Sequence, residues 1–281
     1  MKKIYLLLGL AALIMVVGII SRLLSITKIY KTEVIKELKS ESFERDTLTQ
    51  ADIDFLPQPI QKYLNYVGVI GKEKIHNMRV SFVGDFKLNL KQNWMKCKAE
   101  QYDFFENLNR MFYIKVNMFG VPVEGRDLYY KGKGNMLIRL ASLITIANDK
   151  GPEMDIAEMV TLFNDMCLFA PASLIDKRIQ WQTIDSLTVK GIFEKNGQKV
   201  SAVLFFNEKG ELINFTTNDR YYISGKNYKK VEWSTPVKNY SEFAGIKVPV
   251  EAEAIWHFTE GDFCYAKFKL KEIEYNCKRF K

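Results

Sequence analysis

Two pairs of oppositely charged neighbours are the residues best suited to chemistry in this sequence. Arg126 precedes Asp127, Asp219 precedes Arg220, and each pair stands near the end of a segment with a strand pattern. A carboxylate beside a guanidinium is suited to acid–base catalysis or to binding a polar headgroup. The alternative is that both pairs are structural ion pairs that hold loops in place. We favour the structural alternative and keep the four residues as the candidate site of an envelope enzyme.

Motifs of known enzymes and cofactor sites are absent from the sequence. It contains no Gly-x-Ser-x-Gly sequence, no Walker-type loop and no dinucleotide-binding glycine pattern. The stretch YYKGKGNM (129–136) has two glycines but no helix at the right spacing, which favours a tight turn over a phosphate site. The four cysteines form no Cys-x-x-Cys pair, and the two histidines lie far apart. We therefore expect no metal, no cofactor and no catalytic residue, and favour a protein that is not an enzyme.

The net charge of +8 comes from 41 basic and 33 acidic side chains distributed along the chain. No block of five basic residues occurs, and no aromatic residues surround a basic, glycine-containing stretch as in RNA-binding modules. These features argue against a nucleic-acid partner. Attraction to anionic lipid headgroups is the electrostatic role that remains.

The N-terminal region has the pattern of a membrane anchor. Residues 4–20 carry no charge, with Lys2 and Lys3 before them and Arg22 after them. No convincing small-x-small cleavage site comes after this stretch, and no cysteine precedes Cys97, which argues against a cleaved signal peptide and a lipoprotein. We expect a transmembrane anchor over residues 1–22 and a helical stalk or linker over 23–51. The basic residues on the two sides of this segment do not decide its orientation, and by number they lean toward a cytoplasmic domain. Because an N-terminal segment of this kind normally exports the chain behind it, we favour a single-pass protein with an extracytoplasmic soluble domain.

Residues 52–281 are predicted to form one antiparallel β-rich domain. In LPQPIQKYL (56–64) the prolines fit the first turn of a short helix, and Gly68 suits its end. Strand patterns then alternate, and Asn196-Gly197 is a hairpin signal. A helical insert interrupts them around 153–176, where Asp155 and Glu158 have capping-box spacing.

The architecture expected from this pattern is α+β: an anchor and stalk, then one large curved antiparallel sheet with a few covering helices. Strand twist accumulates, so a sheet of nine to eleven strands cannot remain flat and should curl into a half-barrel. Helices on its concave side would leave an apolar cavity, unless large side chains fill it. The four tryptophans are spread over four segments, and we expect most in the core and one or two at the cavity.

Five segments in order resemble a family of uncharacterised bacterial proteins with an N-terminal span, usually described as a domain of unknown function. They are LPQPIQKYL (56–64), GRDLYYKGKGNML (125–137), EMVTLFNDMCLFAPASLI (158–175), FNEKGELINFTTNDRY (206–221) and VEWSTPVKNYSEFAGIKVPVEAEAIW (231–256). The chain departs from the family pattern Tyr-Leu-x-Glu, with Phe163-Asn164-Asp165 in the helix. The resemblance implies no activity. The layout is also similar, more distantly, to periplasmic lipoprotein carriers, which are half-barrels with a helical lid that bind acyl chains.

Taken together, these patterns predict a membrane-tethered domain that binds an apolar or amphipathic ligand, such as a lipid or hydrophobic small molecule, without catalysis. The alternatives are the envelope enzyme and a structural protein that binds a partner in the envelope through an exposed apolar patch. No protein partner is identified. The candidate ligand-binding residues are Trp94, Arg126, Asp127, Tyr129, Trp181, Arg220, Trp233 and Trp256.

Overall fold

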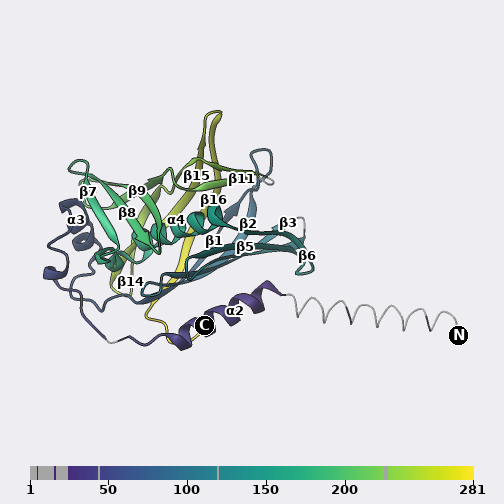
Figure 1. Cartoon of the computed structure of the whole chain (residues 1–281), viewed down its shortest axis with the longest axis horizontal. Coiled ribbons are helices and arrows are strands. Elements are labelled where there is room, and N and C mark those ends of the chain that lie inside the picture. The colour runs from purple at the N-terminus through teal and green to yellow at the C-terminus, as the bar shows by residue number, and fades with distance from the viewer. Residues whose placement is uncertain (1–4, 6–15, 17–24, 44, 119, 225–226) are drawn as a thin grey trace.

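One large antiparallel sheet of fourteen strands curves through most of the chain, with a helix on each of its faces (Figure 1). The structure is a computed structural model that describes residues 5, 16, 25–43, 45–118, 120–224 and 227–281. The sheet is open, and its strand order runs from β6 through β5, β4, β3, β2, β1, β16, β15, β13, β10, β9 and β8 to β7, while β14 pairs with β15. The predicted curved antiparallel sheet is confirmed, with more strands than the nine to eleven expected.

The strands of the first half of the sheet follow one another in a meander. They are β1 (Asn77–Phe86), β2 (Met95–Phe104), β3 (Asn109–Met118), β4 (Val121–Tyr130), β5 (Lys133–Leu140) and β6 (Ile144–Lys150). The second half contains β7 (Ile179–Thr183), β8 (Thr188–Lys195), β9 (Gln198–Phe206), β10 (Leu212–Thr217), β13 (Glu232–Ser234), β14 (Val237–Phe243), β15 (Ile246–Phe258) and β16 (Gly261–Tyr275). A separate hairpin consists of β11 (Tyr221–Ser224) and β12 (Asn227–Lys230).

Alternation of apolar and polar residues places the core on the inner face of the sheet. In β9, for example, Val200, Ala202, Leu204 and Phe206 are buried, because successive side chains of a strand point to opposite faces. The turn between β8 and β9 has positive φ angles at Asn196 and Gly197, as a two-residue hairpin requires.

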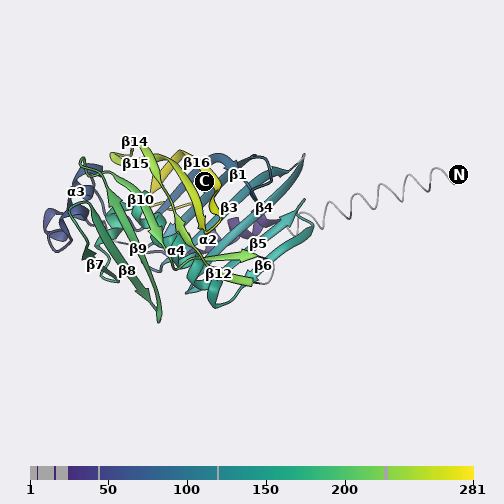
Figure 2. The same ribbon diagram turned by 90° about the horizontal axis from the view of Figure 1, so that it is seen from above.

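Helix α4 (Pro152–Phe169) lies in the concavity of the sheet. Figures 1 and 2 place it between the β2–β6 side and the β7–β10 side. The short helix η2 (Pro171–Ile175) comes directly after it. The predicted capping box is wrong: the N-cap is Gly151, and Asp155 instead accepts hydrogen bonds from the Gly134 amide (2.7 Å) and Lys133 Nζ (2.9 Å).

Among the residues described from 25 onward, two α-helices precede β1. Helix α3 (Gln58–Val67) comes after the turn η1 (Gln50–Asp52), has Pro57 at its N-cap and ends at Gly68 with a φ of 78°. Helix α2 (Ile26–Ser40) packs against the outer face of β2–β4, where Tyr30 stacks on Tyr113 with ring centroids 5.5 Å apart. The segment expected to be a stalk is therefore, over α2, part of the folded domain.

The predicted anchor over residues 1–22 lies, apart from Tyr5 and Val16, outside the described residues. Within the part of the chain that is described, no helix has both the length and the apolar character needed to cross a bilayer.

Candidate functional site

Side chains from β2 to β5 form parallel rows on the inner face of the sheet, beneath α4. The register aligns Asp103, Arg110, Tyr129 and Gly134 in one row. The next row contains Gln101, Phe112, Asp127 and Met136, and the third contains Ala99, Ile114, Gly125 and Ile138. The inner face therefore changes from charged to apolar along the strands within three rows.

The charged end of these rows is joined to α4 by buried ion pairs. Arg110 donates from Nε to Asp165 Oδ2 (2.7 Å) and from Nη1 to Glu158 Oε2 (3.1 Å), and all three side chains are at most 7% exposed. Asp103 is fully buried beside them and accepts a hydrogen bond from Gln101 (3.0 Å). Arg110 thus ties strand β3 to two turns of α4.

Burial dominates the ionisation of this cluster. It raises the pKa of Glu158 to about 7, with repulsion from Asp127 added and Arg110 opposing. Burial also raises the pKa of Asp165, which Arg110 counteracts, and holds the pKa of Asp103 well above its ordinary range. The pKa of Asp127 is raised by burial, against the opposing charges of Arg110 and Arg220. Four carboxyl groups that share two guanidinium groups therefore retain protons more strongly than free carboxyl groups do.

Arg220 approaches the same cavity from the opposite side, just before β11. Its guanidinium carbon lies 4.2 Å from the ring centre of Trp233 and 5.6 Å from that of Trp256. Its Nε and Nη1 atoms are buried and have no hydrogen-bond partner among the described residues. Stacking on two indoles stabilises the cation, but buried N–H groups without acceptors carry a desolvation cost. The guanidinium can therefore still bind an acceptor from a ligand.

A cavity of about 360 Å³ separates α4 and the β11–β12 hairpin from the sheet. Its size is within the range of small-molecule sites, roughly 300–1,000 Å³. Its charged lining includes Arg110, Asp127, Glu158, Asp165 and Arg220. The apolar lining includes Phe82, Phe86, Leu88, Phe112, Ile114, Met136, Ile138, Leu168, Phe169, Tyr222, Trp233, Trp256, Phe263, Tyr265 and Phe268. The arrangement suits a molecule with one polar group and an apolar body.

Four of the eight candidate residues line this cavity: Asp127, Arg220, Trp233 and Trp256. They come from β4, the segment before β11, β13 and β15, and the curvature of the sheet brings them together.

The other four candidate residues lie elsewhere. Arg126 points to the outer face, where Nε is 3.4 Å from Glu33 of α2. Tyr129 is fully buried and donates to Gln198 (2.8 Å). Trp181 packs on Phe163 of the core, with ring centroids 6.1 Å apart. Each of these three side chains has a structural role.

Trp94 lies in the connection between β1 and β2, with Lys87 and Lys267 over its ring at 4.5 and 5.3 Å.

Asp219 accepts hydrogen bonds from the Ser201 amide (2.8 Å) and hydroxyl (2.9 Å). With Arg126 on the outer face and Asp219 bound to β9, the four residues proposed for an envelope enzyme do not converge.

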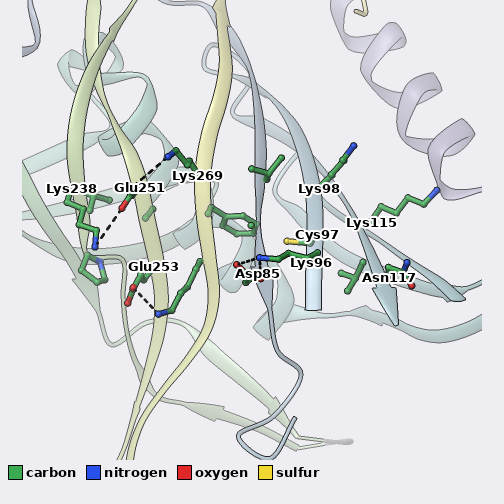
Figure 3. A pocket seen from close by; sticks show the side chains of 18 of the residues that line it. Asp85, Lys96, Cys97, Lys98, Lys115, Asn117, Lys238, Glu251, Glu253 and Lys269 are labelled. Carbon is green, nitrogen blue, oxygen red and sulfur yellow. Dashed lines mark hydrogen bonds and ion pairs between the residues drawn. The ribbon is translucent and has the colours of Figure 1, made fainter. Parts of the chain in front are cut away.

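A second, larger depression of about 1,270 Å³ lies on the outer face, across β14, β15, β16, β1, β2 and β3 (Figure 3). We call it the outer groove. Its walls contain lysines and three carboxylates. Lys96 forms an ion pair with Asp85 (2.8 Å), and Lys267 forms one with Glu253 (3.4 Å). Lys238 and Lys269 both approach Glu251, at 3.7 and 4.0 Å. The remaining lysines of the groove are Lys98 and Lys115.

Sequence reasoning missed Arg110, Glu158, Asp165 and Gln101. The available signal was on α4, where Glu158 and Asp165 stand seven positions apart on one face of a largely apolar helix. Arg110 is 48 and 55 positions from its two partners, so no local spacing marks it. Within the described residues, no group of His, Cys, Asp and Glu side chains is arranged to hold a metal ion.

Comparisons with known proteins give one family and two similar folds. The profile of a family described as a family of unknown function, DUF6544, matches residues 46–268. No curated protein matches the chain. A LolA superfamily protein from Nitrosomonas europaea is 8% identical, with a TM-score of 0.41 over 78% of this chain and 94% of that one. A DUF1329 family protein from Desulfovibrio piger is 10% identical, with a TM-score of 0.45 over 82% of this chain and 94% of that one.

Proposed function

Because the chain belongs to DUF6544, a family of unknown function, we propose its function from its own geometry: it binds an amphipathic ligand, such as a lipid, in the cavity under α4. The observation that carries the proposal is the lining of the cavity, which combines a buried cluster of charged side chains with a large surface of aromatic and aliphatic side chains. An apolar chain among these side chains would be removed from water. This burial would stabilise the complex by roughly 25 cal/mol per Å² of apolar surface.

Arg220 is the side chain proposed to bind the polar group of the ligand. Its two partner-free N–H groups are suited to a phosphate or carboxylate oxygen. Asp127 and Glu158, close enough to feel the charge of Arg220, limit how much negative charge the cavity accepts. A zwitterionic or singly charged headgroup suits this balance better than a multiply charged one.

The proposal includes a membrane tether with the domain outside the cytoplasm. The uncharged residues 4–20, flanked by lysines and an arginine, support the tether. The absence of a convincing cleavage site after them supports an uncleaved anchor.

Native mass spectrometry of the purified full-length protein, with lipid extraction in parallel, tests the proposal. We expect a stoichiometric amphipathic ligand in the unmodified chain. Ala254→Trp fills the cavity from β15 and should abolish ligand retention. Ala51→Trp adds the same side chain at an exposed position away from the cavity and should retain the ligand.

Arg220→Met separates the two parts of the proposed site. It should lower the affinity for a ligand with an anionic group about tenfold or more and leave the binding of a purely apolar probe unchanged. Thermal unfolding of each variant establishes that it is folded. A folded Ala254→Trp protein that retains its ligand, or an unmodified protein that holds none and takes up no lipid, would contradict the proposal.

A further inference from the structure

Exposed apolar side chains gather at one edge of the domain. From residue 25 onward, nine large hydrophobic side chains are exposed among the described residues, and six of them lie in or beside three neighbouring strand connections. We call these six the apolar edge: Leu88 (53% exposed), Leu90 (65%), Val121 (40%), Leu143 (38%), Ile144 (61%) and Ile146 (55%). A cluster of this kind on a soluble surface marks an interaction site.

The sheet topology brings these connections together. Strands β1, β3 and β5 run in the same direction, so the connections after them leave the sheet at the same edge. Figures 1 and 2 show the ends of β3 and β6 on the side of the domain where α2 begins.

Helix α2 begins at this edge. Thr27 in its first turn contacts Tyr113 (3.0 Å) and Glu124 (3.1 Å), and Glu124 also accepts a hydrogen bond from Ser142, between β5 and β6. Residues 1–24 therefore join the domain beside the apolar edge. Ile26 comes only six positions after Ile20, a reach of at most about 22 Å.

Two lysines of the outer groove add a positive charge next to the apolar edge. Lys98 and Lys115 are exposed and stand directly opposite each other on β2 and β3. Figure 3 shows both projecting on the side of the groove next to α2. Like charges in directly opposite positions are destabilising. Glu124, opposite Lys115 on β4, offsets part of this repulsion, and an anion between the two lysines would remove the rest.

The ligand cavity reaches the surface at the same edge. Its lining extends to Lys87 and Leu88, and the Leu88 side chain is half exposed. Of the rows that line the cavity, that of Ile114, Gly125 and Ile138 lies nearer this edge along the strands, and that of Arg110 lies further from it. A ligand leaving the cavity by this route passes the apolar edge.

We propose that the domain docks onto an anionic bilayer through the apolar edge, with Lys98 and Lys115 on lipid phosphates and the cavity opening onto the membrane surface. The inference rests on the proposed ligand cavity and tether, and it adds the orientation and the source of the ligand. Apolar side chains inserted among headgroups and lysines attracted to anionic lipid are the two contributions that hold amphipathic surfaces on membranes. The uncharged residues 4–20, joined to the domain at this edge, make the bilayer the occupant that this surface meets.

Fluorescence quenching on the full-length protein in vesicles tests the docking. Four single-cysteine substitutions each carry an environment-sensitive fluorophore. Leu90→Cys and Ile144→Cys place it at the apolar edge. Phe55→Cys and Ile184→Cys place it elsewhere, at residues whose native side chains are 64% and 56% exposed. The vesicles contain phosphatidylcholine and phosphatidylglycerol. A fraction of the lipid has brominated acyl chains, which quench a fluorophore that enters the bilayer. We expect strong quenching at positions 90 and 144 and little at 55 and 184. Equal quenching at all four positions, or none at 90 and 144, would overturn the proposal.

The native cysteines interfere little with this labelling. Cys97, Cys167 and Cys277 are buried, and Cys264 is half-buried. Burial raises the pKa of Cys97 to about 12 and the pKa values of Cys264 and Cys277 to about 11, so few thiolates form at neutral pH. The unmodified chain, treated with the same reagent, measures the remaining background.

A charge reversal tests the role of the lysines. Lys98→Glu with Lys115→Glu should reduce quenching at position 90 several-fold in anionic vesicles and change it little in phosphatidylcholine alone. Lys177→Glu with Lys199→Glu makes the same change in net charge at exposed positions elsewhere and should have little effect. If the two double variants behave alike, the anion-binding role of Lys98 and Lys115 is wrong.

Failure of the docking can be distinguished from failure of the ligand site. Ala254→Trp closes the cavity and should leave the quenching at position 90 unchanged. A protein that holds a lipid but shows no quenching at the apolar edge retains the proposed function and loses the orientation. A protein that shows the quenching but holds no ligand retains the docking and contradicts the proposed ligand binding.

Discussion

Arg79 and Arg220 are arginines on opposite faces of the same sheet, and their surroundings differ sharply. On the outer face Arg79 donates to Glu100 at 2.6 and 2.9 Å and to Glu272 at 2.9 Å. On the inner face Arg220 has two buried N–H groups without an acceptor among the described residues. A satisfied buried arginine contributes to structure, whereas one left open beside a cavity is available to a ligand. On the outer face, the ion pairs of Arg79 therefore hold β1, β2 and β16 together, and on the inner face the open N–H groups of Arg220 support the proposal that a ligand binds there.

The largest effect that separates the two faces is expected from Arg79→Met. Removal of this guanidinium leaves Glu100, only 21% exposed, without a cation and with the Tyr30 hydroxyl as its hydrogen-bond donor. It should lower the free energy of unfolding by about 3–5 kcal/mol. Urea denaturation measures this change, and native mass spectrometry of the folded fraction should show an unchanged ligand content. If Arg79→Met is as stable as the unmodified protein, Arg79 has no structural role that distinguishes it from Arg220.

The second effect concerns pH and the cluster under α4. Burial raises the pKa of Glu158 from about 4.5 to about 7, so the folded state binds this proton more tightly than the unfolded state. Stability is then lost as pH rises from about 4.5 through 7, by up to about 3 kcal/mol from this group. Glu158→Gln should flatten the pH dependence of the free energy of unfolding over that window. Glu194→Gln, at an exposed ion pair with Lys199, is the control that should not alter it.

The smallest effect is expected from Lys96→Ala in the outer groove. Its ion pair with Asp85 is short (2.8 Å), but the lysine side chain is 86% exposed. Solvent screening and side-chain entropy reduce such pairs to below about 0.5 kcal/mol. Urea denaturation midpoints of this variant and of Arg79→Met would show whether burial, and not distance alone, decides the contribution of an ion pair here.

Local signals predicted much of the secondary structure. The prolines at 57 and 59 and Gly68 mark helix α3, and the apolar residues that recur at helical spacing along it are buried: Leu56, Ile60, Tyr63, Leu64 and Val67. Asn196-Gly197 forms the expected hairpin. The resemblance drawn from five motifs is confirmed by the family match over residues 46–268. These features depend on backbone preferences and periodicity within a few residues, which a sequence displays directly.

The site was harder to predict because it is assembled from distant segments. Arg126 and Asp127 are neighbours in the chain, but they belong to opposite faces of β4, so the charged pair does not act as a unit. Arg110 meets Glu158 and Asp165 only because α4 crosses the concavity above β3. The position of a helix over a curved sheet depends on packing along the whole chain.

The open edges of the sheet have a consequence for the width of the cavity. A closed barrel has a radius fixed by its strand number and stagger, whereas this sheet ends at β6 and β7. Its curvature is therefore set by the side chains on which it rests, chiefly those of α4. Substitutions of Ala157 or Thr161, which line the cavity from that helix, should therefore change the width of the cavity without altering strand pairing. In the proposed function, the residues at these two positions would set the thickness of the ligand that the cavity accepts.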